Sequence, residues 1–347
     1  MYSVTRFLKS ILISLCTGIA STGVSAKMVE MADNELSDVS GQAFINLTTD
    51  QNSGIDYTRL NLGLKVETQL NIKQLELGKY ARAGEPIDSA DILINNFALG
   101  TVNADDTVNP FLITDPYLEL AYDGNKVVGV RVGFDEAKGH LSGDIKSLTG
   151  NIPIKIEGTA SPIFDAASTF EDVLLTLAGV TRSTRLQADA GLVTQDGSSD
   201  LTRATYSGLE NGQRLTCSDC NLTGFTDALL SLFSSNGCEV LSLPTCFPLS
   251  NFQSLPVGNL NVVDNPNTAA IEGAARGFFL SLQTQDVAWR DKDSNAFRNV
   301  LAGAFLNIPN YRDENGNIVA PIKLDFEQAF NGIARQDTCL GSATVGC

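Results

Sequence analysis

From Ile55 onward, apolar and polar residues alternate over a stretch that is long for a single strand. The apolar residues all occupy even positions: Leu60, Leu62, Leu64, Val66, Leu70 and Ile72. A period of two places these side chains on one face of an extended chain. Most strands contain only about 3–10 residues, whereas this run predicts one half-buried strand of roughly 16 residues. The pattern requires a fold organised around a sheet.

Two further alternating runs, Leu118–Tyr122 and Val128–Phe134, flank the step Asp123-Gly124. An Asp-Gly step between alternating runs favours a tight hairpin. Similar runs predict four more strands, at 185–193, 276–289, 299–308 and 318–326. Asn315-Gly316 predicts a second hairpin between the last two of them. We therefore expect a mainly β, antiparallel sandwich or roll with long amphipathic strands and two or three short helices.

Residues 161–178 carry the strongest helical pattern of the chain. Ser161 is suited to cap the helix, Pro162 fits its first turn, and Gly179 follows its last turn. One apolar stripe follows the helical period: Ile163, Ala167, Phe170, Leu174 and Leu177. Shorter helical patterns cover residues 28–41 and 226–234.

The first 26 residues read as a secretory signal peptide. Arg6 and Lys9 form the charged region, Ile11–Ala20 the apolar region, and Val24-Ser25-Ala26 a cleavage site. A membrane anchor would need about 18 or more apolar residues, so this run is too short. We expect export through the Sec pathway to the periplasm, the cell surface or the medium, with no transmembrane helix after signal cleavage.

Export changes the interpretation of the cysteines, because six remain once Cys16 is removed. An even number of cysteines in an exported chain implies disulfides, here among Cys217, Cys220, Cys238, Cys246, Cys339 and Cys347. Closeness in sequence favours the pairs 217–220, 238–246 and 339–347, and an exchange of partners within 217–246 stays open. A redox or zinc role for the C-x-x-C pair is disfavoured, because no helix begins directly after it and no second C-x-x-C follows.

These features divide the chain into five segments. Residues 1–26 are the signal peptide, and 27–42 form a short N-terminal helix. A β-rich core at 43–210, which includes the helix 161–178, is followed by a disulfide-braced insertion at 211–260. Strands at 261–347 complete the core and end in a stapled tail.

The charge excludes one large class of function. The chain has 24 Lys and Arg against 40 Asp and Glu, a net charge of −16, whereas nucleic-acid binding needs a basic surface. Its single histidine, His140, does not lie in a G-x-S-x-G motif, and no phosphate-binding glycine motif occurs. The turns 291–295 and 313–317 start like calcium loops but lack the required glycine and glutamate positions. We expect no cofactor, and these two turns are the only calcium candidates.

Two stretches carry a resemblance to known proteins. Glu35–Ala43, with the sequence ELSDVSGQA, resembles the N-terminus of a group of exported gammaproteobacterial proteins, some of them associated with pilus or filament gene clusters. Pro116–Ala121 and Val128–Phe134 are similar to central strands of the same group. Residues 35–41 also resemble a double-glycine bacteriocin leader, but Gln42 replaces the second glycine. The first resemblance implies an envelope location and transfers no functional residue.

The first functional hypothesis is a secreted or cell-surface structural or adhesive envelope protein, pilus- or filament-associated and without catalysis. Its partners would be other envelope or surface proteins. The alternative is a periplasmic carrier whose strands enclose a lipid or another hydrophobic ligand, which requires an apolar cavity. A further alternative is a hydrolase that uses a pair of carboxylates, although no pair stands out among the 40 acidic residues.

Overall fold

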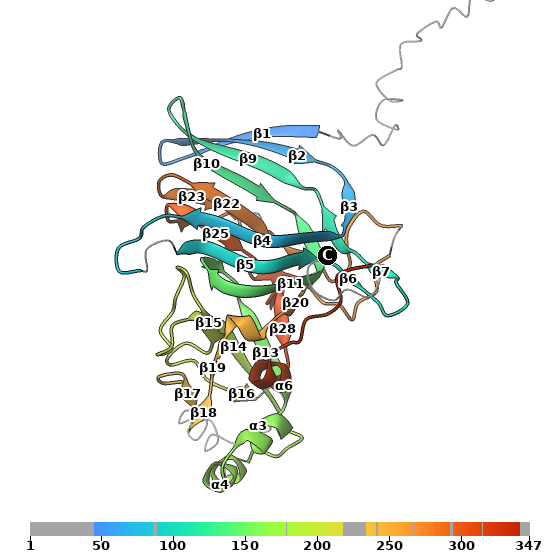
Figure 1. Cartoon of the computed structure of the whole chain (residues 1–347), viewed down its shortest axis with the longest axis vertical. Helices are drawn as coiled ribbons and strands as arrows, with labels where there is room; N and C mark the ends of the chain where they lie inside the picture. The colour runs from blue at the N-terminus through green and yellow to red at the C-terminus, as the bar shows by residue number, and fades with distance from the viewer. Residues whose placement is uncertain are drawn as a thin grey trace, which may run out of the picture. The chain divides into compact units, whose positions relative to one another are not determined.

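Two of the sheets hold seven strands each. The first has the spatial order Ile45–Asn52 (β1), Ile55–Leu62 (β2), Tyr117–Asp123 (β9), Lys126–Gly133 (β10), Phe279–Gln283 (β22), Gly303–Asn307 (β25) and Gly150–Asn151 (β12). All neighbours are antiparallel except β12 and β25. We call this the large sheet, and its strands lie side by side in Figure 1. The computed structural model describes residues 45–85, 89–177, 179–217, 234–240, 242–265, 267–291, 294–313 and 315–340. They belong to one unit, Ala43–Cys347.

A second sheet has the order Lys65–Thr68 (β3), Phe111–Thr114 (β8), Glu136–Leu148 (β11), Ala90–Leu99 (β5) and Leu70–Lys79 (β4), and Ser254–Val257 (β20) and Ala275–Arg276 (β21) also pair with β11. Four connections run directly from the large sheet into this one: β2 to β3, β8 to β9, β10 to β11 and β21 to β22. Backbone hydrogen bonds continue across the bend, since Leu62 N donates to Pro116 O and Phe134 N to Phe278 O. The predicted long strand is therefore three strands in two sheets, because the chain bends after Leu62.

A third sheet has the order Cys246–Pro248 (β19), Tyr206–Gly208 (β15), Arg185–Val193 (β14), Ile154–Thr159 (β13) and Ile322–Leu324 (β28), with Thr216–Cys217 (β16) beside β14. Four two-stranded pairs complete the strands: Thr101–Val102 (β6) with Val108–Asn109 (β7), Glu239–Val240 (β17) with Leu243–Pro244 (β18), Val287–Arg290 (β23) with Phe297–Val300 (β24), and Tyr311–Arg312 (β26) with Ile318–Val319 (β27). Mainly antiparallel β structure is thus confirmed.

Both predicted hairpin turns are present. Asp123-Gly124 joins β9 to β10, and Gly124 has a φ of 58°. Asn315-Gly316 joins the two-residue strands β26 and β27. The predicted pairing of 299–308 with 318–326 is wrong, because β25 pairs with β22 and β28 pairs with β13. Positive φ is the conformation that glycine adopts without a steric cost.

The helix predicted at 161–178 is two helices, Ser161–Ala166 (α3) and Thr169–Leu177 (α4). Ala167 is extended, with a ψ of 148°, and Ser168 N donates to Glu171 Oε2 at 2.5 Å. Ser168 and Glu171 have the spacing of a capping box, so a new helix begins where one stripe seemed to continue. The prediction of one continuous helix is therefore wrong, and Phe170 is 72% exposed.

The remaining helical elements are Phe326–Asn331 (α6) and the 3₁₀ turn Leu249–Asn251 (η1). Asp325 caps α6 by accepting from Gln328 N at 2.7 Å. The prediction of residues 211–260 as an insertion outside the core is wrong for the described part. Leu249, Phe252, Leu255 and Val257 belong to the main hydrophobic core, because β20 pairs with β11.

Cys238 and Cys246 form a disulfide, as predicted. Each of Cys217 and Cys339 also takes part in a disulfide. Cys220 and Cys347, the partners predicted for them, lie outside the described residues. So do the predicted signal peptide at 1–26, the helix predicted at 27–42, and all but the last residue of the helix predicted at 226–234. Within the described part, no helix is long and apolar enough to cross a membrane.

Candidate functional site

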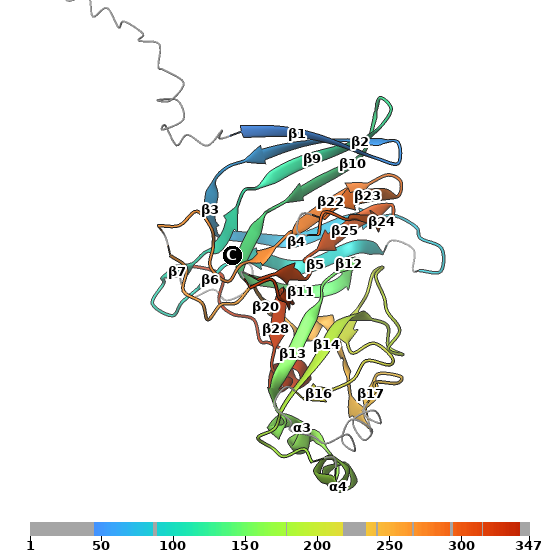
Figure 2. The same cartoon turned by 180° about the vertical axis from the view of Figure 1, so that it is seen from behind.

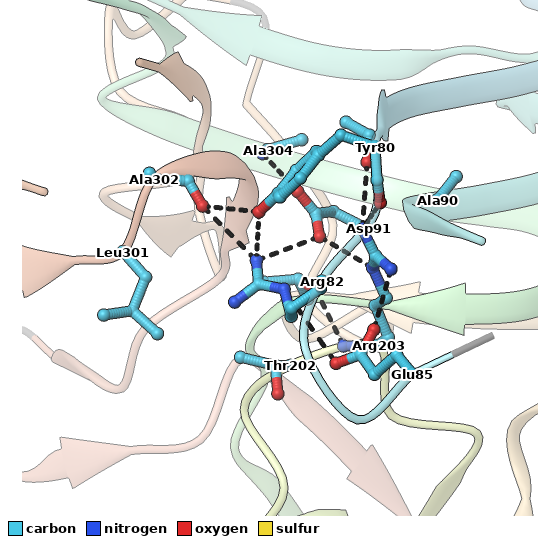
Figure 3. A network of polar contacts seen from close by, with 12 residues as sticks. Tyr80, Arg82, Glu85, Ala90, Asp91, Thr202, Arg203, Leu301, Ala302 and Ala304 are labelled. Carbon is cyan, nitrogen blue, oxygen red and sulfur yellow. Dashed lines mark hydrogen bonds and ion pairs between the residues drawn. The ribbon is translucent and has the colours of Figure 1, made fainter. Parts of the chain in front are cut away.

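The most elaborate polar cluster surrounds Asp91, at the start of β5 (Figure 3). This carboxylate is fully buried. Its Oδ1 accepts from Arg82 Nη2 at 3.1 Å and from Arg203 Nε at 2.9 Å, and its Oδ2 accepts from Ala304 N at 2.8 Å. Two guanidinium groups and a backbone amide thus satisfy both oxygens, as a buried carboxylate requires.

Arg203 and Tyr80 complete this Asp91 cluster. Arg203 Nη1 lies 2.8 Å from Glu85 Oε2, and its Nη2 donates to Tyr80 O at 2.8 Å. Tyr80 Oη donates to Ala302 O at 2.8 Å, and burial together with the Asp91 charge raises the pKa of this phenol. Arg203 also has a φ of 51°, a strained conformation for a residue other than glycine.

Two glycines close the backbone around the carboxylate. An added Cβ would lie 2.3 Å from Asp91 Oδ2 at Gly78 and 2.1 Å from the same oxygen at Gly303. The Asp91 cluster therefore joins the end of β4, the start of β5 and the loops before β15 and β25. None of the three cavities described below is lined by its residues. Its contacts hold four segments of the chain together.

A second buried ion cluster lies on one face of the large sheet. Arg131 Nε donates to Glu119 Oε2 at 2.6 Å, and Arg59 Nε lies 3.2 Å from Glu119 Oε1. Arg131 Nη1 donates to Arg290 O at 2.8 Å, and its guanidinium lies 5.0 Å from the Trp289 ring centroid. The hairpin β23–β24 packs over this face, and Tyr57 Oη donates to Ala288 O at 2.6 Å. Burial, followed by the Glu119 charge, raises the pKa of Tyr57 to about 12.

Of three cavities in the described part, the largest is a cleft of about 460 Å³ at the bend between the two sheets. Its carboxylates are Asp115, Asp135 and Glu136, and Arg276 also lines it. Glu136 Oε2 accepts from Ile271 N at 2.8 Å and from Thr114 Oγ1 at 3.2 Å, and its Oε1 lies 3.7 Å from Arg276. These bonds hold a loop against the bend, and they give Glu136 a structural role.

The apolar cavity in the described part is small. It holds about 30 Å³ between β13, α3 and α6, next to Ile156, Ile163 and Phe326. That volume suits about one water molecule, whereas a lipid chain needs far more. A further polar cleft of about 240 Å³ lies beside β14. No apolar cavity of ligand size is present among these three cavities of the described part.

The two acidic turns use their carboxylates within the chain. Asp291 Oδ1 accepts from Ser294 N at 2.8 Å, and Asp313 Oδ1 accepts from Asn317 N at 2.8 Å. In the described residues, no group of three or more His, Cys, Asp or Glu is arranged to hold a metal ion. His140 lies on β11, 3.2 Å from the side-chain nitrogen of Gln336, and burial lowers its pKa.

The opposite side of the large sheet is apolar and exposed. We call it the open sheet face, and its exposed side chains are Ile45 (57%), Leu47 (63%), Leu118 (41%), Val132 (46%) and Leu282 (43%). The strand register places Leu47, Leu60, Leu118, Val132 and Leu280 in one row across five neighbouring strands. Side chains in such a row are direct neighbours. Toward β25 the face passes into the main core, which includes Leu306 and contacts Leu280.

The predicted residues and the observed sites overlap only in part. The alternation at Leu118, Val130 and Val132 correctly identified side chains that share one face. Val128 is different, because a β-bulge between Val127 and Gly129 turns it to the opposite face, where it packs with Tyr57 and Trp289. The Asp91 cluster was not predicted, since its members are spread over more than 200 residues of sequence.

Comparison with known proteins gives one match. A model for a family of unknown function (DUF6160) matches residues 5–110. The matched stretch includes Glu35–Ala43 and extends through β1 to β7. No curated protein and no solved structure matches the chain.

Proposed function

We propose that this chain is an exported, non-catalytic structural or adhesive protein of a Gram-negative envelope, and that it binds another envelope protein through the open sheet face. The exposed row of leucine and valine side chains is the observation that carries this proposal. Large contiguous apolar surfaces on water-exposed proteins mark interaction sites. The two buried ion clusters support a structural role, because their charged groups are used to join segments of the chain.

The N-terminal sequence and the cysteines support export. Arg6, Lys9 and the run Ile11–Ala20 have the order of a signal peptide, and a disulfide such as Cys238–Cys246 is stable in an oxidising compartment. The resemblance of Glu35–Ala43 to exported proteins favours association with a pilus or filament. Fractionation and N-terminal sequencing test this part: we expect a mature chain that begins at Lys27 and is absent from the cytoplasm.

Binding through the open sheet face is tested with a photo-crosslinking amino acid at Leu118 in living cells. Ile318 is the matched control, since it is 67% exposed on β27, away from the face. We expect one defined crosslinked protein from position 118 and none from 318. Equal crosslinking from both positions, or none from either, would contradict the proposal.

A second candidate, transport of a lipid or other hydrophobe, rests on one observation. The open sheet face is continuous with the main core through Leu280 and Leu306, so an acyl chain lying on it would extend a hydrophobic core. Native mass spectrometry after gentle purification separates the two candidates. A retained lipid that is lost in Leu118→Asn favours the carrier, and a bare chain favours the structural protein.

A further inference from the structure

Among the described residues, β1 is the outermost strand at one edge of the large sheet. All eight residues of β1 pair with β2, and no described strand pairs along the other edge. Figure 1 shows β1 at the margin of the large sheet. The side chains from Ile45 to Thr49 are all exposed. An edge strand with free N–H and C=O groups is a template for pairing with another strand.

The edge of the second sheet gives a contrast. Its edge strand, β4, carries Lys73, Glu76 and Lys79, and charged side chains keep other strands from pairing. The C-terminal segment also bonds to its start, since Asn71 Nδ2 donates to Thr338 O at 2.8 Å. β1 has no lysine or proline, and its single charge, Asp50, lies 2.8 Å from Arg290 Nη1. One edge is thus protected, and the other is suited to pairing.

We propose that β1 pairs with β1 of a second copy of this chain, antiparallel and about a two-fold axis at Thr48. A two-fold axis perpendicular to the sheet places the same patch of both copies in contact. The two seven-stranded sheets then become one continuous sheet. The inference goes beyond the proposed function, since it uses the strand edge and holds whatever the open sheet face binds.

The length and charge pattern of β1 limit the register. In a two-fold pair, each residue faces its mirror position about the central one. Centring on Thr48 pairs seven of the eight residues, places Thr48 opposite Thr48, and sets Asp50 opposite Asn46. Threonine pairs across strands are favourable, whereas like charges directly opposite are not. Centring on Asp50 would place the two carboxylates together, and centring on Leu47 would shorten the pairing to five residues. Centring on Thr49 also pairs seven residues, with Asp50 opposite Thr48. The Thr48→Cys variant separates the two registers, because centring on Thr49 would place the two Cα atoms at position 48 about 8 Å apart, too far for a disulfide.

The same register joins the apolar surfaces of the two copies. Ile45 and Leu47 point to the open sheet face, and a perpendicular two-fold axis keeps that face on one side of the combined sheet. The net charge of −16 on each chain opposes association. Salt screens such repulsion between exposed charges. Raising the salt concentration from 20 to 300 mM shortens the Debye length from about 20 Å to about 6 Å. We therefore expect dimer formation to strengthen over this range.

Single cysteine variants of the purified full chain test the register. In a directly opposed antiparallel pair the Cα atoms lie about 4.5–5.5 Å apart, which a disulfide can bridge. Thr48→Cys is therefore expected to give disulfide-linked dimers under mild oxidation. Gln51→Cys, exposed on the same strand, is the matched control, because its two copies would lie roughly 20 Å apart. Linkage at position 51 that equals or exceeds linkage at position 48 would overturn the pairing.

Light scattering provides a measurement that needs no cysteine. We expect the unmodified chain to be a dimer at 100 µM, Thr48→Lys to be a monomer because two lysines face each other, and Gln51→Lys to remain a dimer. Circular dichroism of the three proteins checks that each is folded. A monomeric unmodified chain, or equal association of both lysine variants, would contradict the proposal.

Discussion

The two faces of the large sheet invert the usual distribution of polar and apolar side chains. The face covered by the hairpin β23–β24 buries Arg131 and Glu119, whereas the open sheet face exposes Leu118 and Val132. Figure 2 shows β23 and β24 beside β22. Alternation along a strand defines two faces but does not say which one another element will cover. Which of the two faces is covered depends here on Trp289, which lies on β23, far away in sequence, and packs with residues such as Tyr57 and Val128.

The covered face tolerates charge because each charged group has several partners. Glu119 contacts two guanidinium groups, and Arg131 lies near the rings of Tyr117, Phe279 and Trp289. Cation–π contacts of this kind are strongest where water is excluded. Glycines permit the close packing, since a Cβ at Gly133 would lie 2.4 Å from Tyr117 Cζ. The open sheet face has no comparable cover among the described residues.

Removing a partner from the buried ion cluster should have the largest effect. Arg131→Met leaves Glu119 buried with only Arg59, and breaking a buried pair costs about 3–5 kcal/mol of unfolding free energy. Urea unfolding followed by tryptophan fluorescence measures this loss, because Trp289 is the only tryptophan.

Arg276→Met is the control for Arg131→Met. The Arg276 side chain is 42% exposed and lies 3.7 Å from Glu136, so its loss should cost less than about 1 kcal/mol. Equal losses for the two variants would show that the covered face has no special dependence on its ion cluster.

A methyl group at Gly129 tests the packing of the same face. The added Cβ would lie 2.8 Å from Trp289 Cζ2, on a ring that is fully buried. Gly129→Ala should therefore cost about 1–3 kcal/mol through overpacking. Gly191→Ala, also in a strand, meets no atom within 4 Å and should leave the unfolding midpoint nearly unchanged. A Gly129 variant as stable as the Gly191 variant would contradict tight packing under the hairpin.

Local pattern was sufficient to predict the two strands on either side of Asp123-Gly124 and the turn between them. Alternation identified the runs around Leu118 and Val132, and Asp123-Gly124 identified the hairpin between them, because both signals depend on neighbouring residues. The bend after Leu62 was not predictable, since alternation continues through Leu64 and Val66 while the chain changes sheets. The break after Ala167 had a signal, the Ser168 to Glu171 capping box, which the longer apolar stripe concealed.

The buried clusters depend on contacts that are distant in sequence. Arg59, Glu119 and Arg131 occupy the polar positions of alternating strands, which sequence alone assigns to solvent. Only the strand register reveals that Glu119 lies directly between the two arginines. The Asp91 cluster has no signal in the sequence, because Arg203 lies in a loop and Ala304 in β25, and neither belongs to a motif.

Alkaline pH offers a smaller test of the covered face. Burial raises the pKa of Tyr57 to about 12, above the value of about 10 in an unfolded chain. The unfolded state therefore loses this proton first, and stability falls as pH rises from 10 toward 12. Tyr57→Phe should cost about 1 kcal/mol at pH 8, through the lost hydrogen bond to Ala288 O. Its stability should then fall less steeply above pH 10, and an unchanged slope would contradict the role of Tyr57.

The smallest effect on stability is expected on the open sheet face. Leu118→Asn changes a side chain that is already 41% exposed, so the free energy of unfolding should change by no more than about 0.5 kcal/mol. Ala121→Asn, on the same strand but the covered face, is the matched control. Ala121 is fully buried, and a larger polar side chain there should cost at least about 2 kcal/mol. Because Leu118→Asn keeps the fold, any loss of crosslinking or of bound lipid in that variant reports on the face itself. A Leu118 variant as unstable as the Ala121 variant would mean that the leucine row is part of a core, and the difference between the two faces would disappear.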